Sequence, residues 1–279
     1  MTPALAVGID VGATKLAAAV VDLDAGRLAG PSARRPTRPQ RGPEAVLADC
    51  VALAREVAAG HRAGAVGIGI CEVVDRDGRP RTAETIDWRT TDVAAAFAPL
   101  GPVAIESDVR AAAIAEARHG PARDFLYVSV GSGISHSLVA DGVPRAGARG
   151  SAINTGAPLV EAWSGGLALA RRSGHRSAEE ALADPAAAAI VEDGAQRLGE
   201  VLAAIVNAID PGAVVFGGGL GLDARYRNRV VAAMRAAVYD DAVRDLPVRT
   251  AFLGAEGAIV GAALATARTG QRGSVASIA

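Results

Sequence analysis

The amino-acid sequence predicts an α/β protein made of two halves that share one design. Residues 4–21 form an apolar run, a polar turn and a second apolar run, which is the pattern of a β-hairpin. Residues 125–140 repeat this arrangement around a glycine-rich turn, and each hairpin is followed by mixed strand-like and helix-like segments. The duplication is weak in residues but clear in layout, so we expect two related halves.

Length and composition exclude several classes of protein. The chain has 279 residues and a formal net charge of −1, so it can bury a core of its own and carries no overall basic field that would attract nucleic acid. Its two cysteines, Cys50 and Cys71, lack the spacing of a disulfide framework or a thiolate metal site. No window is apolar enough to span a membrane, and no leader precedes the first apolar run. We therefore expect a cytoplasmic protein without membrane or nucleic-acid partners.

The turn of the first hairpin contains groups that suit phosphate or a hydrated metal. It runs from Asp10 to Lys15 and offers a carboxylate, backbone N–H groups, a hydroxyl and an ammonium. Lys15 is the only lysine in a chain that otherwise uses arginine as its cation. The alternative is a tight turn with a solvated lysine.

The rest of the first half alternates helices with short strands. Residues 31–43 are rich in proline and arginine and are expected to form an exposed connection. Asp108 lies at a strand-to-helix junction. The expected elements are a helix over 44–59, a buried strand over 65–70, a strand over 103–105 and a helix over 109–118.

The second half continues in the same manner after its hairpin. The expected helices cover 159–172, 185–209, 224–240 and 254–267, and the expected strands cover 214–216 and 248–253. The last helix carries glycines at 257 and 261, so we expect it to pack closely on another element.

Three glycine-bearing turns follow strands in this chain. They contain Gly12, then Gly131 and Gly133, then the run from Gly217 to Gly219. Each alone is weak evidence, because glycine serves tight turns everywhere, but three in this order indicate a nucleotide site. Neither the P-loop nor the dinucleotide-binding fingerprint is present, so a different nucleotide-binding fold is predicted.

Several motifs in order resemble those of the ROK family of sugar kinases. They are D-x-G-x-T-K at 10–15, E-S-D at 106–108, G-S-G-I at 131–134, V-E-A-W-S-G at 160–165, D-P-G-A-V-V-F-G-G-G at 210–219 and L-G-A-E-G-A-I-V-G-A-A at 253–263. The resemblance spans nearly the whole chain. It implies the actin-like, ribonuclease H-type fold with two domains, 1–106 and 107–255, a nucleotide cleft between them, and a helix over 256–270 that packs back on the first domain. It also implies ATP, magnesium and a sugar hydroxyl as acceptor.

The resemblance also implies roles for individual residues. Asp108 is similar to the general base that accepts the hydroxyl proton, although an N-cap role is the alternative. Asp10 would hold hydrated magnesium, and Lys15 would offset charge on the transferring group. The expected phosphate contacts are Gly12, Thr14, Gly131, Ser132 and Gly133; the expected adenosine contacts are Gly217, Gly218 and Gly219; and the expected substrate-binding residues are Glu72, Ser107, Asn154 and Glu161.

Departures from the family pattern gather on the acceptor side. Residues 153–157 read I-N-T-G-A where the family has G-E-x-G-H, so a sugar-binding glutamate and a histidine that binds sugar and zinc are missing. The cysteine-rich zinc loop that should follow is absent, so we predict no structural zinc. Ser107 replaces an asparagine, and Cys71-Glu72 replaces Pro-Gly. His136, near the second turn, is expected to face solvent.

Three functional hypotheses remain. The first is an ATP-dependent kinase acting on a hexose-like sugar, amino sugar or cyclitol other than plain glucose. The second is a sugar-sensing regulator, but the DNA-binding segment and basic patch of such proteins are missing from this sequence. The third is a degenerate kinase retained as a partner subunit. Family resemblance and the apolar helices around Val201 and Val230 further predict a homodimer.

Overall fold

The computed structural model describes residues 4–155 and 159–275, with side chains up to residue 267. The chain divides into two compact units. The first contains residues 1–119, 146–151 and 256–279, and the second contains 120–145 and 152–255. The first unit therefore extends past the boundary expected at residue 106. It does so because the helix that follows that boundary packs on the C-terminal helix of the same unit.

The first unit is built on a sheet that starts with the predicted hairpin. Strand β1 (Leu5–Val11) pairs antiparallel with β2 (Lys15–Asp22), whose other edge carries β3 (Arg27–Leu28) and β4 (Ala33–Pro36). On its far side β1 pairs in parallel with β5 (Ala63–Ile70), which pairs in parallel with β6 (Val103–Ser107). The carboxyl ends of β1, β5 and β6 consequently meet at one edge.

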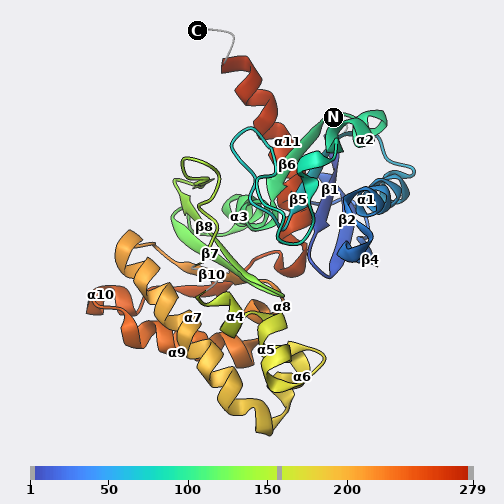
Figure 1. The fold of residues 1–279 in the computed structure, drawn as a ribbon. Coiled ribbons are helices and arrows are strands. Elements are labelled where there is room, and N and C mark those ends of the chain that lie inside the picture. The colour runs from blue at the N-terminus through green and yellow to red at the C-terminus, as the bar shows by residue number, and fades with distance from the viewer. Residues whose placement is uncertain (1–3, 156–158, 276–279) are drawn as a thin grey trace. The chain divides into compact units, whose positions relative to one another are not determined.

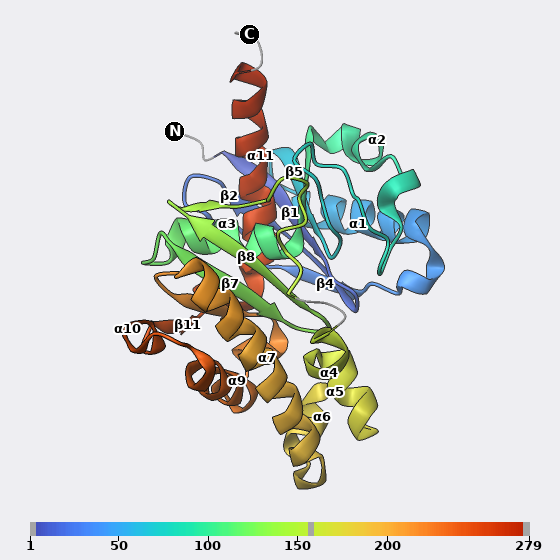
Figure 2. The same cartoon turned by 60° about the vertical axis from the view of Figure 1, so that its left-hand side comes forward.

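The two faces of this sheet bury different kinds of residue, because side chains alternate along each strand. One face presents Ile9 and Ile68 to α1 (Pro43–Ala58) and α2 (Val93–Phe97). The other presents Gly8 and Gly67 to α11 (Gly257–Val275). In Figures 1 and 2, α1 and α11 flank β1 and β5 from opposite sides.

Glycines allow α11 to approach its neighbours closely. A Cβ added at Gly8 or Gly67 would overlap the backbone of α11, and one added at Gly261 would overlap the Ala111 backbone of α3 (Asp108–His119). The expected close packing of this helix is therefore found, and its partners are both the sheet and α3.

The arginine-rich stretch over 31–43 is more ordered than we predicted. It contains β4, the short 3₁₀ helix η1 (Pro39–Arg41) and the first residue of α1. Strand pairing is a backbone interaction, and charged side chains are well tolerated on an edge strand, so Arg34 and Arg35 do not prevent it.

The second unit has a sheet of five strands in the order β11-β10-β7-β8-β9. Its hairpin is β7 (Phe125–Val130) and β8 (Ile134–Ala140), with β9 (Val143–Pro144) beyond it. Strand β10 (Val214–Gly217) runs parallel to β7 and to β11 (Val248–Thr250). The long helices α7 (Ala188–Ile209) and α9 (Ala224–Ala237) pack side by side and bury Leu198, Leu202 and Val230 (Figure 1).

The predicted helix over 159–172 is broken in two. It forms α4 (Glu161–Ser164) and α5 (Gly166–Ser173), separated by Gly165 in an extended conformation. The remaining short elements are η2 (Trp88–Thr90), η3 (Ala98–Leu100), α6 (Ala178–Ala183), η4 (Pro185–Ala187), α8 (Gly219–Leu222), α10 (Asp241–Arg244) and η5 (Gly254–Glu256). Within the described residues, no helix combines the length and the apolar character that crossing a membrane requires.

Candidate active site

Two aspartates lie at the carboxyl edge of the first sheet. In the strand register Asp10 pairs with Gly69 of β5, and Gly69 pairs with Glu106 of β6. Asp108 follows β6 as the first residue of α3, and its Cα lies 3.4 Å from the position that a Cβ on Gly69 would occupy. The topology thus brings together two carboxylates that are far apart in the sequence.

Both aspartates are harder to ionise than usual. Burial, and then the charge of Asp108, raises the pKa of Asp10 to about 7, with Arg34 opposing the rise. Burial raises the pKa of Asp108 to about 6, against the Val109 backbone N–H, while Glu72 adds to the rise and Arg110 opposes it. Carboxylates poised near neutral pH are typical of sites for proton transfer or metal binding.

Asp108 does not act as an ordinary N-cap. Its carboxylate accepts a hydrogen bond at 2.6 Å from the N–H of its own neighbour, Val109. An N-cap side chain instead satisfies an N–H two or three residues further along the helix. This geometry argues against the N-cap role, which was the alternative to a general-base role for Asp108.

The turn of the first hairpin is held by a residue that the sequence analysis missed. Gly12 donates its N–H to the Lys15 carbonyl at 2.9 Å. The fully buried Thr37 donates its hydroxyl to the Gly12 carbonyl at 2.7 Å and its N–H to the Thr14 carbonyl. A single threonine in an arginine-rich stretch gives no sequence signal of this kind. Thr14 and Lys15 themselves are exposed.

A second missed residue is Arg34. Asp10 pairs with Ala17, Ala17 pairs with Arg34, and Lys15 lies two residues before Ala17. Side chains in register share a face. Arg34 and Lys15 therefore lie on the face of the sheet that carries Asp10, and the charge of Arg34 acts on that carboxylate.

Glu72 has a different task from the substrate contact that we expected. Its carboxylate is buried and accepts hydrogen bonds from the hydroxyl of Thr82 and the N–H groups of Glu84, Thr85 and Ile86, at 2.5–3.0 Å. Both oxygens are occupied, so Glu72 fixes the loop over 82–86 instead of presenting a free carboxylate.

Ser107 is also turned away from the expected position. It pairs with Ile70, on the face of the sheet opposite to Glu106, and is completely buried. Its hydroxyl has no hydrogen-bond partner among the described residues.

Cys71 is half-buried, and burial together with the charge of Asp108 raises the pKa of its thiol to about 12, so the thiol stays neutral.

In the second unit, the turn over 131–133 is anchored by the start of α5. Gly166 and Leu167 donate their N–H groups to the carbonyl oxygens of Gly131 and Ser132 at 2.8 and 3.1 Å, and Gly131 donates to Gly133. This anchoring explains the break between α4 and α5, because the freed N–H groups at the start of α5 meet the turn.

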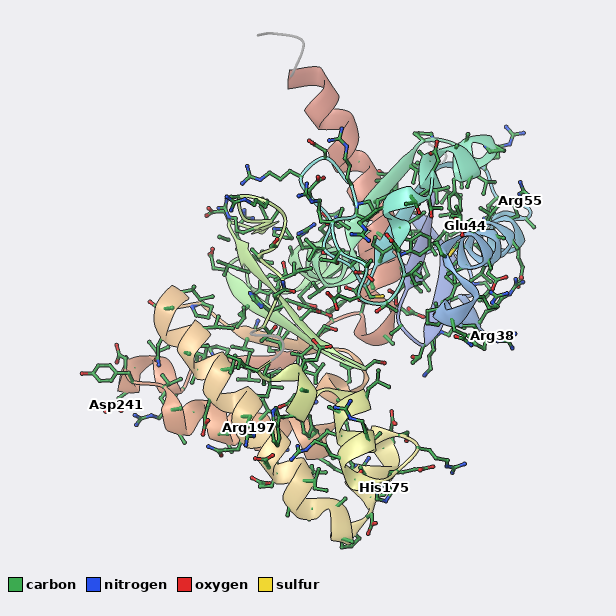
Figure 3. The ribbon with its side chains drawn as sticks, viewed as in Figure 1. Arg38, Glu44, Arg55, His175, Arg197 and Asp241 are labelled. Atoms are coloured by element: carbon green, nitrogen blue, oxygen red, sulfur yellow. The ribbon has the colours of Figure 1, made fainter. Side chains whose placement is uncertain are left out.

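The broken helix is itself fixed to α7. Arg172 and Arg197 stack on the Trp163 ring, 4.5 and 4.0 Å from its centroid, and both donate to Asp193. Arg197 is labelled on α7 in Figure 3. These contacts fix α4 and α5 to α7, and the start of α5 in turn holds the turn over 131–133.

The glycines of the second unit differ in what requires them. A Cβ at Gly217 would overlap the Tyr127 hydroxyl, and one at Gly218, whose φ is 74°, would lie 2.5 Å from the Val130 carbonyl oxygen. A Cβ at Gly131 or Gly219 would meet no protein atom within 4 Å. Since β10 and β7 are parallel and paired, both open positions lie at one edge of the sheet. They leave room for a ligand to approach the backbone.

The other candidate residues of the second unit, Glu161, Asn154 and His136, each have a different environment. The Glu161 carboxylate lies directly against Gly133. Asn154 is exposed and bridges to Ser135 through the backbone. His136 is half-buried, not solvent-facing as we expected: its Nδ1 lies 3.1 Å from the buried Thr155 hydroxyl. The altered positions 156 and 157 lie outside the described residues.

No group of three or more His, Cys, Asp or Glu side chains that could hold a metal ion occurs in the part of the chain that the structure describes. A magnesium ion usually keeps several of its water ligands and needs only one or two protein carboxylates.

Both units, each with an antiparallel hairpin, a glycine-bearing turn and parallel strands, define a nucleotide-binding α/β fold. The family model "ROK family" matches residues 6–165 and 160–268, so the chain belongs to the ROK family. The expected fold class is confirmed by solved structures: a ROK glucokinase from Streptomyces griseus in complex with glucose and AMPPNP superposes with a TM-score of 0.83 at 25% identity, over 93% of this chain and 98% of that one. A ROK hexokinase from Thermus thermophilus gives 0.73 at 30% identity, over 96% and 99%.

Curated relatives are sugar kinases. A glucokinase from Streptomyces coelicolor is 33% identical over 159 residues, 54% of this chain and 49% of that enzyme, so the match spans about half of the relative. A kanosamine kinase from Amycolatopsis mediterranei is 28% identical over 71% of this chain and 75% of that enzyme. A ROK family transcriptional regulator also shares the fold, with a TM-score of 0.78 at 15% identity over 95% of this chain and 78% of that one.

Proposed function

We propose that this protein is an ATP-dependent kinase that transfers the γ-phosphoryl group to a hydroxyl of a hexose-like sugar, an amino sugar or a cyclitol. The observation that carries the proposal is the pair of aspartates at one sheet edge, with pKa values of about 7 and 6. The kinase names of the relatives support the same reaction class. The altered acceptor positions support an acceptor other than plain glucose.

In this proposal Asp108 is the general base. Its carboxylate accepts the proton of the acceptor hydroxyl as the oxygen attacks phosphorus, which positions the hydroxyl for in-line transfer. Burial raises the pKa of Asp108 to about 6, which keeps the group ionised at neutral pH yet basic enough to take a proton. The hydroxyl proton ends on Asp108, and the phosphoryl group passes from ATP to the acceptor oxygen.

The residues fit a nucleotide and a hydrated magnesium ion. Gly131 and Gly219 leave open backbone that phosphate or adenosine would fill, and Asp10 supplies the carboxylate for the ion. Magnesium in that position offsets negative charge on the phosphates. Lys15, on the Asp10 face of the sheet, adds a protein cation for the transferring group.

A non-catalytic regulator or partner subunit remains the second candidate. It is favoured by one observation: of the expected substrate contacts, Glu72 uses its buried carboxylate to hold the loop over 82–86, and Ser107 is completely buried. The intact Asp10, Lys15 and Asp108 oppose it.

The test is a coupled ADP-release screen with ATP and magnesium over hexoses, amino sugars and cyclitols. We expect at least one acceptor to stimulate ADP release well above the ATP-only rate. Calorimetric ATP binding without stimulation by any polyol would contradict the kinase and support the non-catalytic candidate.

A further inference from the structure

Arg110 is a buried cation two residues after Asp108. It is 2% exposed and is the largest of the fully buried side chains among the described residues. A buried guanidinium is costly unless its N–H groups are all used. Here Nε donates to Glu106 at 2.7 Å, Nη1 donates to the Gly150 carbonyl at 2.6 Å, and Nη2 donates to the Val74 carbonyl.

These bonds join three segments that are far apart in the sequence. Glu106 is the next-to-last residue of β6, Val74 precedes the turn over 75–79, and Gly150 belongs to the segment 146–151 that the chain contributes to the first unit. All three segments meet at the first turn of α3, beside Asp108. Arg110 therefore links the three segments to one another at the start of α3, where the proposed general base Asp108 lies.

The contact between two of these segments is itself close. Gly150 has a φ of 85°, and a Cβ there would overlap the Val74 carbonyl and lie 2.7 Å from the Asp75 Cα. Nearby, Arg76 donates from Nε to the Gly147 carbonyl at 2.9 Å. Only glycine fits at position 150 while the segment stays seated on Val74.

Arg110 makes no hydrogen bond to the proposed phosphate turns among the described residues. Among the described residues, the hydrogen-bond partners of Arg110 are Glu106, Val74 and Gly150, and none belongs to the turns over 10–15, 131–133 or 217–219. In the sequence, Val74 closely follows residues 71–72, and the segment 146–151 closely precedes residues 153–157. At both places this chain departs from its family.

We propose that Arg110 is a positioning residue for the acceptor: it holds residues 146–151 and the Val74 turn against the start of α3, so that Asp108 faces the acceptor hydroxyl in a fixed geometry. This inference rests on the proposed kinase function. A purely structural role for Arg110 would affect stability, or ATP and acceptor alike, and the proposed role affects the acceptor selectively.

The first test replaces Arg110 by methionine, which has a similar length but no donors. With the best acceptor from the screen, we expect kcat/KM for the acceptor to fall by about 10- to 100-fold, while the KM for ATP stays within about twofold. Arg118→Met is the matched control, because Arg118 lies on the same helix and donates to the distant Asp24 carbonyl. It should leave both KM values unchanged.

The second test disturbs the same junction without touching α3. Gly150→Ala forces residue 150 away from Val74, and we expect the same selective fall in kcat/KM for the acceptor, with the KM for ATP nearly unchanged. Its control is Gly174→Ala, since Gly174 has a similar φ of 74° but no atom within 4 Å of the added Cβ. Both carry backbone strain, so only the loss of contact with Val74 distinguishes them.

The outcomes separate this inference from the kinase proposal. A wild-type protein without turnover on any acceptor would overturn the kinase proposal and this inference with it. A wild-type protein that turns over, combined with Arg110→Met and Gly150→Ala variants that change acceptor and ATP parameters equally or not at all, would overturn the role of Arg110 alone. If Arg110→Met does not fold, Gly150→Ala decides.

Discussion

A raised pKa distinguishes Asp10 and Asp108 from carboxylates such as Asp87 and Asp223. Asp87 and Asp223 pair with neighbouring arginines, which lower the pKa of each carboxyl group. Asp10 and Asp108 have the opposite shift, because desolvation by burial, together with the charge of Asp108 on Asp10 and of Glu72 on Asp108, outweighs the nearby arginines. The chain therefore keeps two carboxylates in a setting that costs stability, as functional sites often do.

The raised pKa of Asp108 predicts a pH dependence of turnover. A general base must be ionised, so kcat should fall about tenfold per pH unit as the pH drops below about 6, the pKa of Asp108. The measurement is kcat at saturating ATP and acceptor from pH 5 to 8. The residual rate of Asp108→Asn should lack this acid limb. A wild-type kcat that stays constant down to pH 5 would contradict the assignment.

The raised pKa of Asp10 predicts that ionisation of this residue lowers the free energy of unfolding. Its folded pKa of about 7 lies above the ordinary value of 3.8, so its ionisation opposes folding: the stabilising contribution is present below about pH 4 and is lost as pH rises through 7. In magnesium-free buffer, Asp10→Asn should raise the free energy of unfolding at pH 8 by about 4 kcal/mol, and much less at pH 4.

Urea denaturation at both pH values measures this effect. Asp241→Asn is the control, because its side chain is 86% exposed. An equal gain for Asp10→Asn at pH 4 and pH 8 would show that ionisation is not the cause.

At the scale of elements, glycines have two separate tasks in this fold. Gly8, Gly67 and Gly261 let α11 lie directly on the sheet and on α3, whereas Gly131 and Gly219 face open space. The first set serves packing, and the second set leaves room for a ligand.

This distinction predicts opposite effects of adding one methyl group. Gly67→Ala should lower the free energy of unfolding by about 3 kcal/mol, because its Cβ would overlap the Ala262 backbone. Gly131→Ala should leave stability within about 0.5 kcal/mol but weaken ATP binding by about tenfold or more. Urea denaturation and calorimetry with ATP measure the two quantities. A destabilised Gly131→Ala that binds ATP normally would reverse the interpretation.

The sequence predicted the elements well where hydrophobic periodicity is strong. Both hairpins, the strand over 65–70 and the long helices were found close to their expected positions. Periodicity missed β4, because its arginines hide a strand that pairs only through its backbone, and it missed the break at Gly165, which depends on contacts with the turn over 131–133.

The candidate site was predictable only in part. Asp10 and Asp108 stood out because they follow strands, and parallel strands gather their ends at one edge. Thr37 and Arg110 were missed, and Glu72 received the wrong task, because their roles depend on hydrogen bonds to residues that are distant in the sequence. Local sequence patterns do not reveal hydrogen bonds between residues that are distant in the sequence.

At the scale of the whole molecule, two expectations remain predictions. The first is the lack of structural zinc, which follows from the missing cysteine-rich loop. Elemental analysis of the purified protein should find no stoichiometric zinc, and a zinc-selective chelator should leave the unfolding midpoint unchanged. A tightly bound zinc ion would contradict this prediction.

The second expectation is a homodimer, based on family resemblance and the apolar helices around Val201 and Val230. Val230 is fully buried against its own unit, whereas Val201 on α7 is only partly buried. Light scattering at micromolar concentration should give twice the mass of the chain, 28.0 kDa. A mass equal to that of one chain would show a monomer.

The central claim is that Asp108 accepts the proton of a sugar-like hydroxyl, and the kcat of Asp108→Asn tests it most directly. Asparagine keeps the shape of the side chain, and its amide oxygen can still accept the hydrogen bond from the Val109 N–H, so stability and ATP affinity should remain close to wild type. Turnover on the best acceptor should fall by about 10²- to 10⁴-fold, because the acceptor of the proton is gone. A variant that keeps more than about a tenth of wild-type kcat would remove Asp108 from the mechanism.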